Sequence, residues 1–238
     1  MRKITVLLVD DHTLMRQGVR ALLQAQSDIE IVGEAGTGRQ AVERTKVLNP
    51  NVVVMDIAMP LLNGLEATRR ILKQNPSSRV LILSSYGDDE YVHQLTEAGA
   101  AGYLLKDSAV TDLVKAIREA HQGRSYFSPP IARRLMEHFR ERLVRGVPVR
   151  KRTDLLTPRE TEVLQLIAEG KANKQIAGEL GLGIKTIEHH RQQVMKKLNI
   201  HDIATLTRYA LSKGIVEMGF PTERTAMLAP SHQGKPPA

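Results

Sequence analysis

The sequence predicts an α/β fold: a doubly wound, five-stranded parallel sheet in the first half of the chain and an all-α domain of four helices in the second. In the first half, short apolar runs alternate with longer segments of helical periodicity, the pattern of a parallel sheet with helices on both faces. From Leu156 to about Gly214 no strand pattern remains, and four helical segments follow one another closely.

Five strand-and-helix units make up the first half. The predicted strands are ITVLLV, IEIVGE, NVVVMD, RVLILS and AGYLL. The predicted helices begin at Thr13, Thr37, Asn63, about Asp88 and about Val110, and the last one ends at His121. The nearly unbroken Val, Ile and Leu content of the strands indicates that the sheet is buried on both faces, with right-handed crossovers between the strands.

Charge divides the chain at about the same place as the secondary-structure pattern. Residues 1–123 hold 14 Lys and Arg against 15 Asp and Glu, a net charge of −1, and residues 124–238 hold 20 against 11, a net charge of +9. A basic domain is expected to meet a polyanion, although a merely solvated basic surface would carry the same excess.

These patterns define four regions. Residues 1–123 form the predicted sheet domain and residues 153–216 the helical domain. Residues 124–152 are expected to be a linker with one amphipathic helix, whose apolar positions are Ile131, Leu135, Phe139 and Leu143. Residues 217–238 contain four prolines among polar residues, and we expect this tail to be disordered.

The composition also bears on the compartment. The chain has no cysteine, so neither disulfides nor thiolate metal sites contribute, and a reducing cytoplasm fits. The only apolar run at the N-terminus, Ile4 to Val9, is too short for a signal peptide or a membrane span. We therefore expect a cytoplasmic protein with no membrane partner.

Four predicted strands end in residues of compatible chemistry. Asp10 and Asp11 end the first strand, Asp56 the third and Ser84 the fourth, and Lys106 closely follows the fifth. In an open parallel sheet, functional groups gather at the carboxyl ends of the strands. Clustered carboxylates repel one another unless a cation neutralises them, and oxygen ligands favour Mg²⁺. Single acidic residues at strand ends are often only turn formers or helix caps, but the combination favours a functional site.

The motifs VDDH, MDIAMPLLNG, LILSSY and GYLLKD resemble those of receiver domains in two-component signalling, which have a flavodoxin-like fold. The resemblance implies that Asp56 accepts a phosphoryl group from a histidine kinase and that Lys106 contacts the phosphate. It also implies a Mg²⁺ site formed by Asp10, Asp11, Asp56 and the backbone carbonyl of Ala58. Ser84 and Tyr103 would be the pair that switches on phosphorylation.

An enzymatic alternative starts from the same aspartate. An aspartyl-phosphate nucleophile with nearby Ser and Lys also resembles haloacid-dehalogenase-type phosphatases, which generally carry a second aspartate two residues after the nucleophile. Ala58 occupies that position here. Without that acid and base, turnover of a phosphoryl-aspartate should be slow, which suits a timer better than a catalyst.

The second half contains the helix-start and helix-end signals that are typical of a helix-turn-helix. Thr157, Pro158 and Glu160 predict a capped helix start, and Gly170 predicts its end. A short helix from Lys174 to Leu180 then leads through two glycines, Gly181 and Gly183, to a longer third helix. On that helix Ile187, Val194 and Leu198 share an inward face, which leaves cations and amides on the opposite face.

This segment resembles the LuxR-type helix-turn-helix, most specifically in LTPRE, NKQIA and KTIEHHR, and both halves together resemble response regulators of the NarL/FixJ type. The resemblance implies that the third helix enters the major groove of double-stranded DNA, and that the chain dimerises through its last helix, with Ile203, Leu206 and Leu211. Glu188, His189 and Gln192 are the candidates for reading bases. The candidates for phosphate contact are Lys174, Lys185, Thr186, Arg191, Lys196 and Lys197.

The sequence thus predicts a DNA-binding transcriptional response regulator, not an enzyme, in which phosphorylation of Asp56 switches dimerisation and promoter binding. Two alternatives stay open. One is a Mg²⁺-dependent phosphatase, and the other is a DNA-binding regulator that works without phosphorylation.

Overall fold

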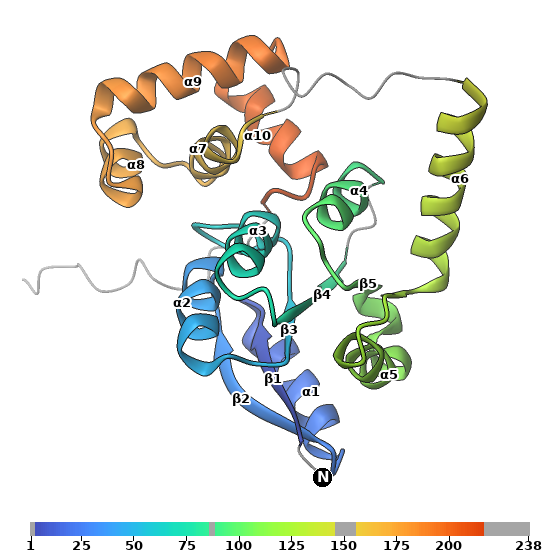
Figure 1. Ribbon diagram of the computed structural model, residues 1–238. Coiled ribbons are helices and arrows are strands. Elements are labelled where there is room, and N and C mark those ends of the chain that lie inside the picture. The colour runs from blue at the N-terminus through green and yellow to red at the C-terminus, as the bar shows by residue number, and fades with distance from the viewer. Residues whose placement is uncertain (1–2, 86–88, 146–155, 217–238) are drawn as a thin grey trace, which may run out of the picture.

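The computed structural model describes residues 3–85, 89–145 and 156–216, with their side chains except at 89–91, 108–111, 138–139 and 141–145. The N-terminal domain is built on a parallel sheet in the order β2-β1-β3-β4-β5-β6. Its strands are β1 (Ile4–Val9), β2 (Ile29–Ala35), β3 (Val52–Met55), β4 (Arg79–Ser84), β5 (Gly102–Leu105) and β6 (Tyr126–Phe127). The predicted fold class is confirmed (Figure 1).

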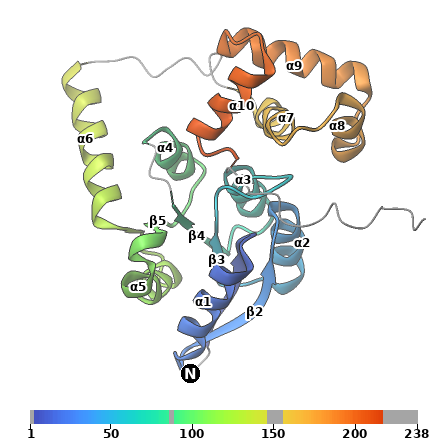
Figure 2. The ribbon, with the colours of Figure 1, turned by 180° about the vertical axis from the view of Figure 1, so that it is seen from behind.

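Helices cover both faces of this sheet, as the burial of alternate strand residues requires. Along β1, Val6 and Leu8 belong to the core under α1 (Thr13–Gln24) and α5 (Ala109–His121). Leu7 and Val9 belong to the core on the other face, under α2 (Gly38–Leu48), α3 (Gly64–Gln74) and α4 (Asp89–Glu97). The result is the expected three-layer sandwich (Figure 2).

The sheet has one strand more than the five that were predicted. Residues Tyr126–Phe127 pair in parallel with β5, with Gly102 opposite Tyr126 and Tyr103 opposite Phe127. Two residues are too few for a recognisable period-two pattern, and they lie in the segment that was expected to be linker. The sixth strand extends the edge of the sheet beyond β5.

The predicted linker helix is present as α6 (Pro129–Arg145). Its first apolar positions face inward, because Ile131 is fully buried and Leu135 is partly buried against the core. The side chains of the other two predicted positions, Phe139 and Leu143, lie outside the described residues. The last part of the predicted linker, residues 146–152, and the whole predicted tail, residues 217–238, also lie outside them.

The C-terminal domain consists of α7 (Pro158–Ala168), α8 (Asn173–Leu180), α9 (Ile184–Leu198) and α10 (Ile203–Ser212). The capping box at the start of α7 forms as expected: the Thr157 side chain accepts from the Glu160 N–H, and the Glu160 side chain accepts from the Thr157 N–H. Gly181 ends α8 in the left-handed region with a φ of 64°, and Gly183 caps α9 without a side chain.

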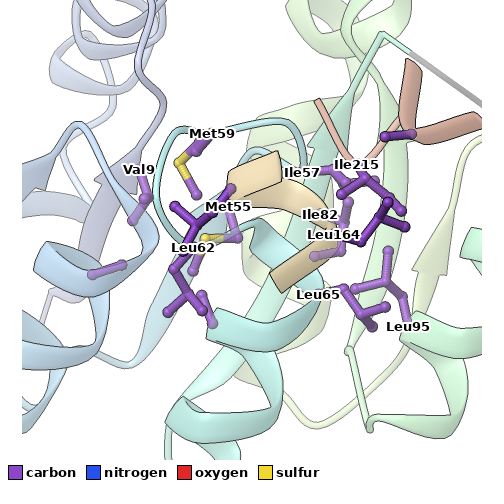
Figure 3. Packing of buried hydrophobic residues seen from close by; sticks show 14 of the residues in the cluster. Val9, Met55, Ile57, Met59, Leu62, Leu65, Ile82, Leu95, Leu164 and Ile215 are labelled. Atoms are coloured by element: carbon purple, nitrogen blue, oxygen red, sulfur yellow. The ribbon is translucent and has the colours of Figure 1, made fainter. Parts of the chain in front are cut away.

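The two domains share one hydrophobic cluster. Figure 3 shows Leu164 of α7 and Ile215, which follows α10, beside Ile57 and Leu65 of the sheet domain. All four residues are at most 4% exposed. The helical domain therefore docks on the loop between β3 and α3 and on α3 itself, and α7 lies between α9 and the sheet domain (Figure 1).

The length and hydropathy of the helices show whether any of them could span a membrane. None of the helices described here combines the length and the hydropathy that a membrane span needs.

Candidate functional site

An acidic pocket lies at the carboxyl ends of the central strands. Val9 of β1 pairs with Met55 of β3, so Asp10 and Asp56 leave neighbouring strands at the same level, and the Asp56 N–H donates to the Val9 carbonyl at 2.8 Å. Asp10 is 6% exposed and Asp56 is 1% exposed. The sheet register, and not local sequence, brings these two carboxylates together.

Lys106 closes this pocket. Its Nζ lies 2.9 Å from Asp56 Oδ2 and 2.9 Å from Asp10 Oδ2, and its side chain is only 8% exposed. The second oxygen of Asp56, Oδ1, accepts from the Ile57 N–H at 2.8 Å. Both oxygens of Asp56 thus already accept a hydrogen bond.

Burial dominates the electrostatics of the pocket. Burial, with a smaller contribution from the neighbouring Asp10, raises the pKa of Asp56 to about 7 against the opposing attraction of Lys106. Burial also raises the pKa of Asp11. Burial by itself would lower the pKa of Lys106, but the carboxylates of Asp56 and Asp10 raise it above its usual value. The pocket therefore holds more negative charge than Lys106 can neutralise.

The donor set fits a divalent cation. One ligand atom from each of Asp10, Asp11, His12 and Asp56 can be chosen so that all lie within 4.8 Å of one another. Three carboxylates match the oxygen preference of Mg²⁺. Ala58, whose carbonyl was the fourth predicted ligand, is buried two residues after Asp56. We therefore regard the residues present as suitable for Mg²⁺.

His12 is a member of this cluster that the sequence analysis did not name. Its ring nitrogen Nδ1 lies 3.1 Å from Asp11 Oδ1 and 3.5 Å from Asp10 Oδ1, and its backbone N–H donates to Asp10 Oδ1 at 2.8 Å. The half-exposed imidazole of His12 therefore lies within ion-pair distance of both carboxylates. The sequence feature that could have identified His12 is its position directly after Asp11.

The predicted switch pair lies beside the pocket. Ser84 ends β4 and pairs with Leu105, the residue before Lys106, so the sheet register places the Ser84 hydroxyl at the level of the pocket. Ser84 and Tyr103 are each 1% exposed. The aromatic ring of Tyr103 is therefore inside the protein in this structure.

The predicted reading helix presents its polar face to solvent. Ile187 and Val194 are fully buried, as the helical period predicts. Seven of the predicted DNA contacts are exposed in the presence of the docked sheet domain, and they are Lys174, Lys185, Thr186, Glu188, His189, Gln192 and Lys196. Figures 1 and 2 show α9 at the end of the molecule remote from the sheet (Figure 1, Figure 2).

Two of the predicted phosphate contacts are engaged inside the helical domain. Lys197 Nζ lies 2.8 Å from Glu160 Oε2, so Lys197 ties the end of α9 to the capping box of α7. Arg191 donates from Nη1 to Asn173 Oδ1 at 2.9 Å and ties α9 to the start of α8. Both cations are half-buried, unlike the exposed Lys196.

The chain matches two protein-family models. The model described as the response regulator receiver domain matches residues 6–118. The model described as bacterial regulatory proteins of the luxR family matches residues 154–210. The chain therefore belongs to the DNA-binding response regulators of two-component systems that join these two domains, the NarL/FixJ type.

Individual relatives share this arrangement over nearly their whole length. The transcriptional regulatory protein LiaR of Bacillus subtilis is 39% identical over 87% of this chain and 96% of its own. MctR of Rhizobium johnstonii is 41% identical over 90% of this chain and 96% of its own. A structure of RcsB from Salmonella enterica serovar Typhimurium, bound to promoter rprA in the presence of the phosphomimetic BeF3-, has a TM-score of 0.61 and 26% identity over 87% of this chain and 98% of that one.

Proposed function

We propose that this chain is a cytoplasmic transcription regulator in which transfer of a phosphoryl group from a histidine kinase to Asp56 controls binding to promoter DNA. The observation that carries this proposal is the geometry of Asp56, which is buried and shares the Lys106 ammonium group with Asp10, at 2.9 Å from each carboxylate. The same chain presents an exposed helix with cationic side chains. Membership of the family supports the combination of a receiver domain with a DNA-binding domain, and the contacts of Asp56 support its role as the residue that is phosphorylated.

The transfer step follows from the contacts of Asp56. A carboxylate oxygen attacks phosphorus and forms a P–O bond while the P–N bond of the phosphohistidine breaks. The electron pair of the P–N bond goes to the departing nitrogen, and the kinase histidine leaves as neutral imidazole because its other ring nitrogen carries a proton. Lys106, now bonded to Asp56 Oδ2, then pairs with a phosphate oxygen. When bound, Mg²⁺ would be held by Asp10, Asp11, Asp56 and the Ala58 carbonyl, and would offset the charge of the phosphoryl group.

The switch that follows is proposed for Ser84 and Tyr103. The Ser84 hydroxyl can hydrogen-bond a phosphate oxygen once it turns toward Asp56, and the ring of Tyr103, on the neighbouring strand β5, is buried. A change at β4 and β5 would reach α4, which follows β4, and so alter the surface of the domain. We propose that this change favours a homodimer through α10, with two copies of α9 in successive major grooves.

Within α9, the exposure of the side chains narrows the proposed DNA contacts. Glu188, His189 and Gln192 remain candidates for base edges, and Lys185, Thr186 and Lys196 for phosphates. For Lys197 we now propose a structural role, because Glu160 already holds its ammonium group.

The experiment is phosphorylation by acetyl phosphate with and without Mg²⁺, followed on gels that retard phosphoprotein, and a gel shift on promoter DNA. Asp56→Asn is expected to take no phosphoryl group and to bind DNA like the unphosphorylated chain. If phosphorylation leaves both DNA affinity and dimerisation unaltered, and Asp56→Asn also changes nothing, the regulator works without phosphorylation.

The phosphatase alternative makes a different prediction. It requires multiple turnovers on small phosphate esters, whereas the methyl group of Ala58 cannot move a proton to or from water. One trapped aspartyl phosphate per chain, without turnover, would exclude it.

A further inference from the structure

Helix α7 of the DNA-binding domain bonds directly to the loop that follows Asp56. The carboxamide of Gln165 is completely buried and spans the loop: Nε2 donates to the Met59 carbonyl at 2.7 Å, and Oε1 accepts from the Asn63 N–H at 2.9 Å. A buried amide is costly unless both of its ends are paired, and here the receiver backbone pairs both. This contact therefore depends on the loop keeping one conformation.

Glu169, one helical turn further along α7, holds the middle of the same loop. Its Oε1 accepts from the Leu61 N–H at 3.0 Å and from Gln165 Nε2 at 2.9 Å. Leu61 has a φ of 70°, a region that a leucine seldom adopts and that persists only where the surroundings impose it. Three backbone groups, at residues 59, 61 and 63, are thus fixed by two side chains of the other domain.

The loop is wound tightly around the phosphoacceptor. The Gly64 N–H donates to the Ile57 carbonyl at 2.7 Å, and a Cβ at Gly64 would collide with the Asp56 carbonyl. Asn63 also caps α3, since its side chain accepts from the Glu66 N–H. The carbonyl of Ala58, a proposed metal ligand, belongs to the peptide group that joins Ala58 to Met59. A hydrogen bond that fixes the Met59 carbonyl therefore also restricts the position of the Ala58 carbonyl, one residue earlier.

We propose that Gln165, assisted by Glu169, is a positioning residue of the phosphoacceptor site, so that the docked DNA-binding domain holds the 57–63 loop in the conformation that binds Mg²⁺ and receives the phosphoryl group. This inference rests on the proposed function of Asp56. A carbonyl that is already in place binds a cation without the entropic cost of ordering its loop. Because α9 stays exposed in the docked state, the contact acts on the receiver and leaves the reading face uncovered.

Linkage makes the effect reciprocal. If docking of α7 strengthens Mg²⁺ binding, Mg²⁺ strengthens docking by the same factor. The backbone N–H groups of Leu61 and Asn63 should therefore exchange with solvent more slowly when Mg²⁺ is present.

The test compares full-length Gln165→Met with the wild type and with Gln74→Met, a matched change at an exposed position of α3. Methionine keeps the volume and removes all three hydrogen bonds of the Gln165 amide, to Met59, Asn63 and Glu169. We expect Gln165→Met to weaken Mg²⁺ binding, measured by calorimetry, and to slow phosphorylation by acetyl phosphate, each by about 3- to 10-fold, the range for the loss of one or two hydrogen bonds to the loop. Hydrogen exchange at Leu61 and Asn63 in EDTA should become faster, and Gln74→Met should match the wild type.

Glu169 supplies a second pair of variants, which decides the matter if Gln165→Met does not fold. Glu169→Gln keeps an oxygen that can accept from the Leu61 N–H and should bind Mg²⁺ like the wild type, whereas Glu169→Met should bind it several-fold more weakly. Mg²⁺ affinities and phosphorylation rates that are equal to the wild type, or higher, in Gln165→Met and Glu169→Met would overturn the positioning role and leave the proposed function intact. A wild-type chain that neither binds Mg²⁺ nor takes a phosphoryl group would overturn both.

Discussion

The acidic pocket and the reading face of α9 are built on opposite principles. In the pocket, side chains from three strand ends converge, and Asp10, Asp56 and Lys106 are paired with one another and are each less than 10% exposed. On the reading face of α9 the side chains of Lys185, Glu188, Gln192 and Lys196 are exposed to solvent. The pocket is therefore complete before its ligand arrives, while the reading face is completed only by DNA.

The largest effect that this contrast predicts is on Lys106. Lys106→Met leaves two buried carboxylates, Asp10 and Asp56, without their shared cation, and breaking a buried ion pair from one side costs about 3 kcal/mol. The free energy of unfolding at pH 8 without Mg²⁺, measured in urea, should fall by this amount. The loss should be smaller at pH 5, where Asp56 can take up a proton. An equal loss at both pH values would mean that packing of the lysine, and not its charge, was removed.

Asp56→Asn should have the opposite sign. The pKa of Asp56 is raised from 3.8 to about 7, so the folded chain binds this proton more tightly than the unfolded chain does. Stability of the wild type must then fall as pH rises from about 4 to about 7, and asparagine removes that slope. We therefore compare the free energies of unfolding of Asp56→Asn and the wild type at two pH values. The difference in favour of Asp56→Asn should be larger at pH 8 than at pH 5, by on the order of 2 kcal/mol. A pH-independent difference would contradict the raised pKa.

Much of the pocket could be predicted from the sequence, because strands set it. Once the strands that end at Val9, Met55 and Ser84 are recognised, a parallel sheet forces the following residues to one edge. The sequence also predicted the capping box of α7 and the buried face of α9, since both depend on local spacing. These are the features in which one residue specifies the position of another.

The contacts between the domains could not be predicted in this way. Gln165 lies in the run LQLIA, and helical periodicity gives no reason for an amide there, because α7 is buried on every side by two different domains. The signal was present in the spacing of Glu162, Gln165 and Glu169, which places three polar side chains on one face of a buried helix. Recognising their partners requires the three-dimensional arrangement.

The reading face predicts a smaller effect that depends on DNA sequence. Gln192→Ala removes an exposed amide that can pair with an adenine edge. Affinity for the preferred promoter site should fall about 10-fold, and affinity for unrelated DNA should not change. Fluorescence anisotropy on both duplexes at one salt concentration measures this. An equal loss on both duplexes would assign Gln192 to the DNA backbone.

Lys196 and Lys197 are adjacent in the chain but differ in the same way as the reading face and the pocket, because one side chain is exposed and the other is paired inside the protein. Lys196 is exposed, and Lys196→Met should weaken binding to all DNA sequences and reduce the slope of log K against log salt by about 0.9, as the loss of one phosphate contact requires. Lys197 is paired with Glu160, whose pKa it helps to lower despite the opposing effect of burial. Lys197→Met should therefore leave the salt slope unchanged and lower the free energy of unfolding by about 1 kcal/mol at pH 7.

The pH dependence separates these two roles further. Because the folded-state pKa of Glu160 is depressed, the contribution of the Lys197 pair is present above the ordinary glutamate pKa and is lost as pH falls through the folded value. Lys197→Met and the wild type should thus converge in stability at low pH, whereas Lys196→Met should match the wild type throughout. A reduced salt slope in Lys197→Met would place its ammonium group on DNA, and would mean that the Glu160 pair opens when the duplex binds.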